Sequence, residues 1–170
     1  MMKDLEKRLE AVADGEEMVV YSAACIENII EDDLAEILTQ GGIPRFWTPD
    51  VDFLREGKGA FEKFKNYVVF AVHNNNLIVL NEKKEVVMLD TECGEEKYII
   101  CNMKAFVYSL VVFNEIVLKI IEENPDCDYY AECLTEDDID YFRKEISLVD
   151  ESAVSEDSFW DCAITEIIED

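Results

Sequence analysis

Hydrophobic and polar residues follow two different periods along this chain, and the middle third has the period of β-strands. Four short runs there are rich in β-branched and aromatic residues: 67–72, 77–80, 85–89 and 97–101. The connections at 74–76 and 81–84 are polar and of hairpin length. We therefore predict four antiparallel strands joined as a meander, with one face of the sheet covered by helices.

The segment after these strands has the period of a helix. Hydrophobic residues recur at spacings of 4, 3, 4 and 3 from Phe106 to Ile120, which predicts a helix over about 103–122 that covers the sheet. Asn102 stands where the last strand turns into this helix, and we expect its side chain to cap a backbone amide there. Polar residues interrupt the apolar stretch 105–121, so we do not expect it to span a membrane.

Shorter helical patterns lie toward both ends of the chain. We predict helices over residues 2–12, from Asp32 to Gly41, over 135–146 and over 155–168. Gly42 and Pro44 are expected to form a turn that ends the second helix and starts an extended segment. In the last helix we expect Phe159 and Trp160 to close the core. Strands grouped in the middle and helices at both ends predict an α+β fold, in one domain over residues 1–170.

The composition adds a strong acidic balance to a chain that can fold. Its 170 residues are 49% hydrophobic, enough to bury the core of one domain. Asp and Glu number 40 against 15 Lys and Arg, giving a formal net charge of -25. This balance excludes nucleic acid as a partner, since phosphate neutralisation needs clustered cations, and it disfavours an anionic membrane surface. A cationic protein partner is favoured, although acidity that serves only solubility remains the alternative.

The acidic residues are concentrated near the C-terminus. From Glu122 to Asp170 there are 18 Asp and Glu but only Arg143 and Lys144 as cations, so these 49 residues carry a net charge of -16. Within this region we expect seven carboxylates to contact or steer a basic protein: Asp126, Asp128, Glu132, Glu136, Asp137, Asp138 and Asp140. The tyrosines between them offer apolar anchors: Tyr129, Tyr130 and Tyr141. The alternative is a solvated helical surface without a partner.

Signatures of catalysis or of a bound cofactor are sparse. The six cysteines lack zinc-ligand spacing, and the glycine pairs lack the strand, loop and helix context of a phosphate loop. The one histidine, His73, follows a predicted strand and is expected to be an exposed turn residue. Carboxylate clusters at 31–33 and 136–138 stand where helices begin, so capping explains them better than metal binding or acid and base catalysis. We expect no enzyme activity, catalytic residue, cofactor, metal or small-molecule substrate.

The first residues give an expectation about the cell compartment. The N-terminal segment is charged and amphipathic, without the basic and then apolar pattern of a secretory signal. We therefore expect the protein in the cytoplasm, where free thiols are the ordinary state of cysteine.

Several segments together resemble the SUKH superfamily of bacterial immunity proteins, specifically its fourth group. They are the turn at Gly42-Ile43-Pro44, the β-meander, the junction at 98–103 that leads into the long helix, and the C-terminal segment containing Asp150, Phe159 and Trp160. The resemblance covers about residues 34–169. It implies that these motif residues have structural roles and that the fold is a SUKH-like α+β domain.

The resemblance also implies a function. Members of this superfamily are encoded beside secreted polymorphic toxins, often nucleases or nucleic-acid deaminases, and neutralise them by binding. A basic cognate toxin that recognises an acidic surface on this chain is therefore expected. Two alternatives stay open: a non-enzymatic regulatory scaffold that binds basic partners, as in the fungal Smi and Knr-type relatives of the superfamily, and a hydrolase that uses clustered carboxylates.

Overall fold

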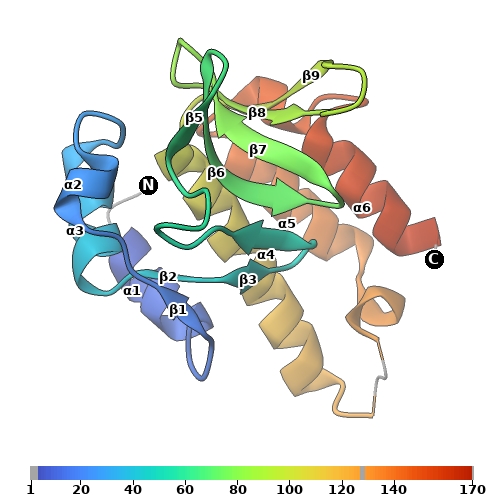
Figure 1. Cartoon of the computed structure of the whole chain (residues 1–170). Coiled ribbons are helices and arrows are strands. Elements are labelled where there is room, and N and C mark those ends of the chain that lie inside the picture. The colour runs from blue at the N-terminus through green and yellow to red at the C-terminus, as the bar shows by residue number, and fades with distance from the viewer. Residues whose placement is uncertain (1–3, 127–128, 170) are drawn as a thin grey trace.

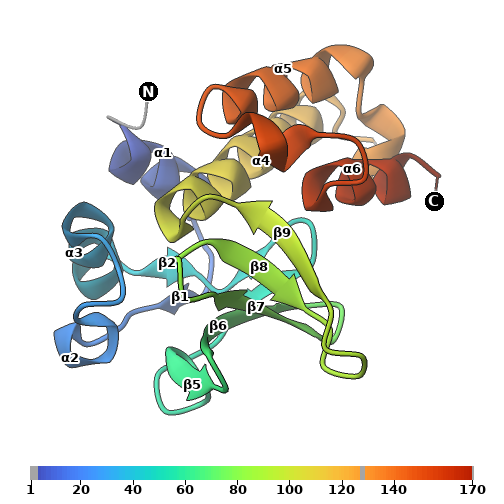
Figure 2. The same ribbon diagram turned by 90° about the horizontal axis from the view of Figure 1, so that it is seen from above.

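The protein is a curved antiparallel sheet with helices layered on one face. The computed structural model describes residues 4–126 and 129–169. Figure 1 looks onto the open face of the sheet, with α4, α5 and α6 behind it. Figure 2 shows the layers from above: α4 and α6 lie against the sheet, and α5 lies on their far side. The predicted α+β class is confirmed.

The sheet contains the predicted meander together with three shorter strands that the sequence did not indicate. Its order is β3-β4-β6-β7-β8-β9, with β5 paired to β6, and all of these pairs are antiparallel. The strands are β3 (Phe46–Trp47), β4 (Val51–Phe53), β5 (Glu62–Phe64), β6 (Tyr67–His73), β7 (Asn76–Leu80), β8 (Val86–Leu89) and β9 (Glu96–Ile100). A separate pair joins β1 (Met18–Val19) to β2 (Ile43–Pro44). Asn74 and Asn75 both have positive φ, which a tight hairpin turn requires.

The five predicted helices occur in the predicted order, with one boundary wrong, and a short sixth helix, α2, was not predicted. They are α1 (Leu5–Val12), α2 (Ala23–Ile26), α3 (Asp32–Gln40), α4 (Met103–Glu123), α5 (Glu136–Ser147) and α6 (Phe159–Glu169), with 3-10 turns η1 (Tyr130–Cys133) and η2 (Glu151–Val154). The last helix was expected from residue 155 but begins at Phe159. Asp157 has φ 61°, outside the helical region, and the Ser158 hydroxyl accepts a hydrogen bond from the Asp161 amide instead.

The main core lies between the sheet and α4. Almost every residue from Met103 to Phe113 is buried, because α4 has the sheet on one side and α1 and α5 on others. Phe53, Phe70 and Phe106 meet there with ring centroids 5.8 to 6.3 Å apart. On the other face of the sheet a small second cluster forms around Val79 and Val87. The fold therefore places α5, with its exposed side, at the outer limit of the helix layer.

Candidate partner-binding surface

The predicted acidic residues lie on and around the outward side of α5. We define the acidic surface as the five exposed carboxylates Asp126, Glu132, Glu136, Asp137 and Asp140. None of them forms an ion pair with a Lys or Arg within the part of the chain that the structure describes. Asp128, also predicted, lies outside the described residues. The surface therefore carries charge that the chain's own cations do not neutralise.

Asp138 differs from its neighbours because its carboxylate is already used within the chain. It is 7% exposed and forms a capping box with Thr135, whose hydroxyl donates to Asp138 at 2.6 Å. Lys119 of α4 approaches the other carboxylate oxygen at 3.0 Å. Burial raises the pKa of Asp138, but the hydrogen bonds from Thr135 and Lys119 outweigh it and the pKa is lowered overall. Asp138 therefore adds negative charge to the region while its side chain begins α5.

A hollow between α4 and α5 adjoins the acidic surface. It has a volume of about 450 Å³ and is lined by Glu115, Ile116 and Lys119 of α4 and by Asp137, Asp138 and Tyr141 of α5. Glu115 is held by Arg8 of α1, with Nε at 2.8 Å from Oε1. Tyr141 is 46% exposed. The exposed phenol of Tyr141 lies in the same lining as the buried Ile116, and an aromatic ring beside an apolar residue is a feature that protein interfaces use as an anchor point.

Asp150 and Asn102 lie together where β9 turns into α4. The Asp150 carboxylate accepts hydrogen bonds from the Cys101 amide at 2.8 Å, from the Tyr98 hydroxyl and from the Ser152 amide at 3.1 Å. Although burial raises the pKa of Asp150, these donors lower it overall. The Asn102 side chain accepts from the backbone amide three residues later at 2.8 Å, as an N-cap. Both sets of contacts are internal: those of Asp150 tie the segment after α5 to the end of β9, and that of Asn102 caps the start of α4.

Phe159 and Trp160 lie beneath the acidic surface. Trp160 is fully buried, with its ring centroid 5.0 Å from Phe142 of α5 and 5.9 Å from Phe113 of α4. Phe159 is 3% exposed and meets the imidazole of His73 edge-on at 5.1 Å. These aromatic contacts join α4, α5 and α6 into one layer.

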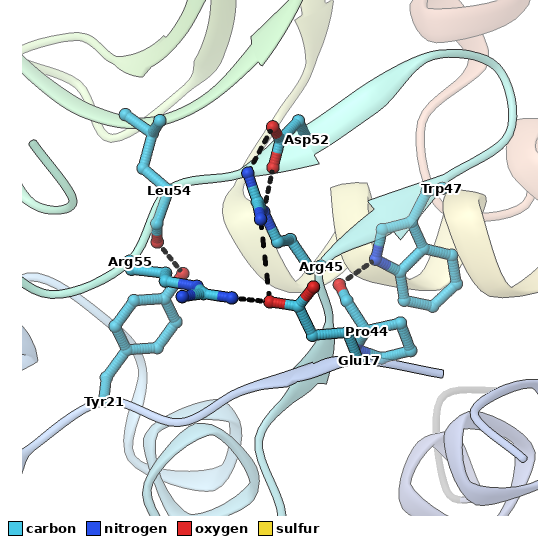
Figure 3. A network of polar contacts seen from close by, with 8 residues as sticks. All are labelled: Glu17, Tyr21, Pro44, Arg45, Trp47, Asp52, Leu54 and Arg55. Atoms are coloured by element: carbon cyan, nitrogen blue, oxygen red, sulfur yellow. Dashed lines mark hydrogen bonds and ion pairs between the residues drawn. The ribbon is translucent and has the colours of Figure 1, made fainter. Parts of the chain in front are cut away.

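The turn at Gly42 and Pro44 belongs to the opposite, N-terminal side of the molecule. Gly42 has φ +79°, and an added Cβ would lie 2.5 Å from the Val19 carbonyl oxygen. The Pro44 carbonyl accepts a hydrogen bond from the Trp47 indole at 2.7 Å (Figure 3). Glycine is required at position 42 because β1 and β2 pair directly beside the turn and leave no room for a side chain there.

Arg45 and Arg55 make the N-terminal side a region of paired charges. Figure 3 shows the Arg45 guanidinium between Asp52, 2.9 Å away, and Glu17, 3.6 Å away, with Arg55 on the far side of Glu17. Arg45 also lies 4.4 Å above the ring of Phe46. These contacts connect the segment before β1 to β3 and β4. Sequence periodicity gave no sign of them, since the partners are set by the tertiary fold.

His73 does not have the exposed position that its sequence context predicted. It was expected to be an exposed turn residue, but it ends β6, is 9% exposed and packs on Phe159. Alternation along β6 places His73 on the same face as the buried Ala71, so the strand period could have indicated its burial. Among the described residues no group of three His, Cys, Asp or Glu side chains could hold a metal ion. No described helix is long and apolar enough to cross a membrane.

Comparison with protein families gives a match that spans nearly the whole fold. A family model described as SUKH-4 immunity protein matches residues 5–166. No curated protein and no solved structure matches the chain. The matched range runs from α1 into α6, so it contains the turn at Gly42, the meander and the acidic surface.

Proposed function

Because this chain belongs to the SUKH-4 immunity protein family, we propose that it binds and neutralises a cognate protein toxin through its acidic surface. Membership confirms the resemblance found in the sequence. A family of immunity proteins implies a role in protection against a toxin and, in general, a non-catalytic one. The identity of the toxin, its charge and the surface that it contacts are the parts of the proposal that go beyond the family.

The chemistry of the surface supports a basic toxin, of the nuclease or nucleic-acid deaminase type. An enzyme that grips nucleic acid needs cations at its cleft to neutralise phosphate. An array of unpaired carboxylates can occupy such a cleft in place of phosphate, and its field accelerates the encounter. The observation that carries the proposal is that Glu136, Asp137 and Asp140 are exposed on one helix without an ion pair to any described cation.

The neighbouring hollow supplies the apolar part of the proposed contact. Charged rims set the association rate, whereas buried aromatic anchors dominate affinity. Tyr141, at the edge of the hollow between α4 and α5, is the anchor that we propose there. Steering by the carboxylates and anchoring at Tyr141 are separable steps, since the first acts on association and the second on dissociation.

The test is binding kinetics against the toxin domain encoded beside the gene for this chain, in the cytoplasmic pH range. Raising salt from about 50 to 500 mM is expected to slow association by one or more orders of magnitude while dissociation changes less. Tyr141→Ala is expected to speed dissociation and leave the salt dependence unchanged. Association that is insensitive to salt would contradict the acidic surface as the steering element.

A further inference from the structure

A second hollow lies at one end of the sheet, apart from the hollow beside Tyr141. Its volume is about 180 Å³. Four parts of the chain converge on it: the β3–β4 turn at 48–50, the end of β6, the segment at Tyr129 and Tyr130, and α6. The turn is fixed to α4, because the Asn114 side chain donates to the Thr48 carbonyl at 2.9 Å and accepts from the Thr48 amide at 3.3 Å.

The hollow has an apolar floor and an acidic rim. Pro49, Ala163 and Ile167 are buried at its floor, whereas Asp50 and Glu166 are exposed at its edge. No Lys or Arg is among the described residues that line it. The two carboxylates therefore produce a negative potential that no cation of the lining cancels. The potential acts beside the apolar floor, from which water is easily displaced.

Aromatic rings complete the wall. Tyr129 and Tyr130 have ring centroids 5.1 Å apart, and Tyr129 is 44% exposed. Burial raises the pKa of Tyr130, and the charges of Tyr129 and Asp50 act in the same direction, so the Tyr130 phenol stays neutral. Neutral phenol faces attract cations, and carboxylates beside them strengthen that attraction.

The hollow also contains an unsatisfied polar atom. His73 is 9% exposed, and its Nδ1 is buried without a hydrogen-bond partner in the described structure. Its Nε2 lies 3.3 Å from the Asn74 side-chain amide. The Asn74 amide nitrogen donates to Nε2, so Nδ1 carries the ring proton and faces no acceptor among the described residues. The imidazole therefore supplies no acceptor for a cation, but its place in the lining makes it a reporter on the hollow.

We propose that this hollow, which we call the cation pocket, binds the side chain of an arginine or lysine from the protein partner. The charged head is neutralised by Asp50 and Glu166 and contacts the tyrosine rings, while the alkyl stem covers the apolar floor. An anionic guest would be repelled by the rim. A metal ion does not fit, because the acids and the histidine do not form a metal-binding group among the described residues. The choice of a protein side chain as guest rests on the proposed function, in which the partner is basic.

The pocket can be tested without the toxin. His73 is the only histidine, so the imidazole of labelled histidine gives one NMR signal that reports on the pocket. The probe is N-butylguanidinium chloride at constant ionic strength, and N-butylurea is the neutral control of matched shape. We expect a saturable shift of the His73 signal with a millimolar dissociation constant for the cation and none for the urea. Absence of a shift, or an equal shift with the urea, would overturn the pocket and leave the proposed function untouched.

Variants then locate the charge that binds the probe. Asp50→Asn combined with Glu166→Gln is expected to weaken N-butylguanidinium binding by about tenfold or more, since both charged acceptors are lost. Asparagine tolerates the positive φ of 41° at position 50, so the turn keeps its conformation. Glu151→Gln combined with Glu156→Gln removes two exposed carboxylates elsewhere and is expected to leave probe binding unchanged. If the two double variants weakened N-butylguanidinium binding equally, Asp50 and Glu166 would not be the carboxylates that bind the probe.

The same two pairs identify the source of the cation. With the cognate toxin, the Asp50 and Glu166 pair is expected to speed dissociation about tenfold relative to the control pair, because losing a buried charge partner acts on dissociation. Unchanged dissociation of a toxin that binds normally would overturn a protein side chain as the guest. Failure of salt to slow association would count against the proposed function and not against the pocket.

Discussion

The two parts of this molecule differ in how many cations accompany their carboxylates. In the first 121 residues the net charge is only -9, and ion pairs join distant segments: Arg8 to Glu115, Arg45 to Asp52, Arg55 to Glu17 and Lys104 to Asp33. In the last 49 residues the net charge is -16, and most exposed carboxylates have no such partner among the described residues. The first part has 13 cations for its 22 carboxylates, whereas the last part has 2 for its 18, so the negative field of the last part is less compensated.

The acidic region tolerates its own repulsion because its inner side is aromatic. Phe113, Phe142 and Trp160 pack together directly beneath the outward side of α5. Apolar burial supplies the stability there, so the exposed carboxylates need not contribute to it. The comparison therefore predicts that interior changes affect folding, and that changes of exposed acids affect binding alone.

Among the substitutions considered, Trp160→Ala should destabilise the protein most. Removing a fully buried indole leaves a cavity between α5 and α6, and we expect a loss of about 3 to 5 kcal/mol in the free energy of unfolding, measured with urea. Tyr141→Ala, at an exposed ring on the same layer, is the control and should cost far less. A Trp160 variant of normal stability that no longer binds the toxin would make the indole an interface residue.

Gly42→Ala should have the next largest effect, in the region of paired charges. The positive φ costs about 1 kcal/mol for alanine, and the contact with the Val19 carbonyl adds to it, so we expect about 2 kcal/mol or more. Gly94→Ala is a matched control, since Gly94 has φ +77° with nothing within 4 Å of the added Cβ. If Gly42→Ala and Gly94→Ala lowered the free energy of unfolding equally, the contact of the added Cβ with the Val19 carbonyl would not contribute to the loss at Gly42.

Asp150→Asn should lower stability at neutral pH by about 1 to 2 kcal/mol, because charge-assisted hydrogen bonds are weakened. The pKa of Asp150 is lower in the folded chain than its unfolded value of about 3.9. Its contribution is therefore complete above about pH 4 and is lost as the pH falls through the folded pKa. Urea unfolding between pH 7 and pH 2.5 should show this loss in the wild type and a smaller one in Asp150→Asn. A parallel pH dependence in the two proteins would contradict the role of Asp150.

Asn102→Ala should have the smallest effect, about 1 kcal/mol, since one N-cap hydrogen bond of α4 is removed. Asn102→Ser keeps a capping oxygen and should recover most of that loss in the same thermal or urea measurement. Toxin binding is expected to be unchanged in both variants. Lost binding at full stability would contradict the architectural role.

The difference between the two regions also explains how far the sequence could predict the molecule. The meander, the long helix α4 and the helix begun by Thr135 were predicted because strand period, helix period and capping residues are local signals. The short strands β3, β4 and β5 were missed because their pairing is set by tertiary contacts that no local period records.

The sequence predicted how many acidic residues the C-terminal region has, but not which contacts their side chains make. The acidic C-terminal third could be counted from the sequence, whereas the internal use of Asp138 depends on Lys119, which comes from another helix. The burial of His73 and the cation pocket beside it depend on four segments that meet only in the folded chain. The spacing of residues in the sequence carries no information about these tertiary contacts.

The most direct test of the account compares two triple variants that remove the same charge from the two regions. Glu136→Gln, Asp137→Asn and Asp140→Asn neutralise the acidic surface, and Glu10→Gln, Asp14→Asn and Glu16→Gln neutralise exposed acids on the N-terminal side. At low salt the first triple should slow association with the cognate toxin by roughly three- to tenfold, because local rather than total charge steers the encounter. The second triple should change association less than twofold, with both variants folded. Equal slowing by the two triples, or none by the first, would contradict the acidic surface as the place where the toxin is recognised.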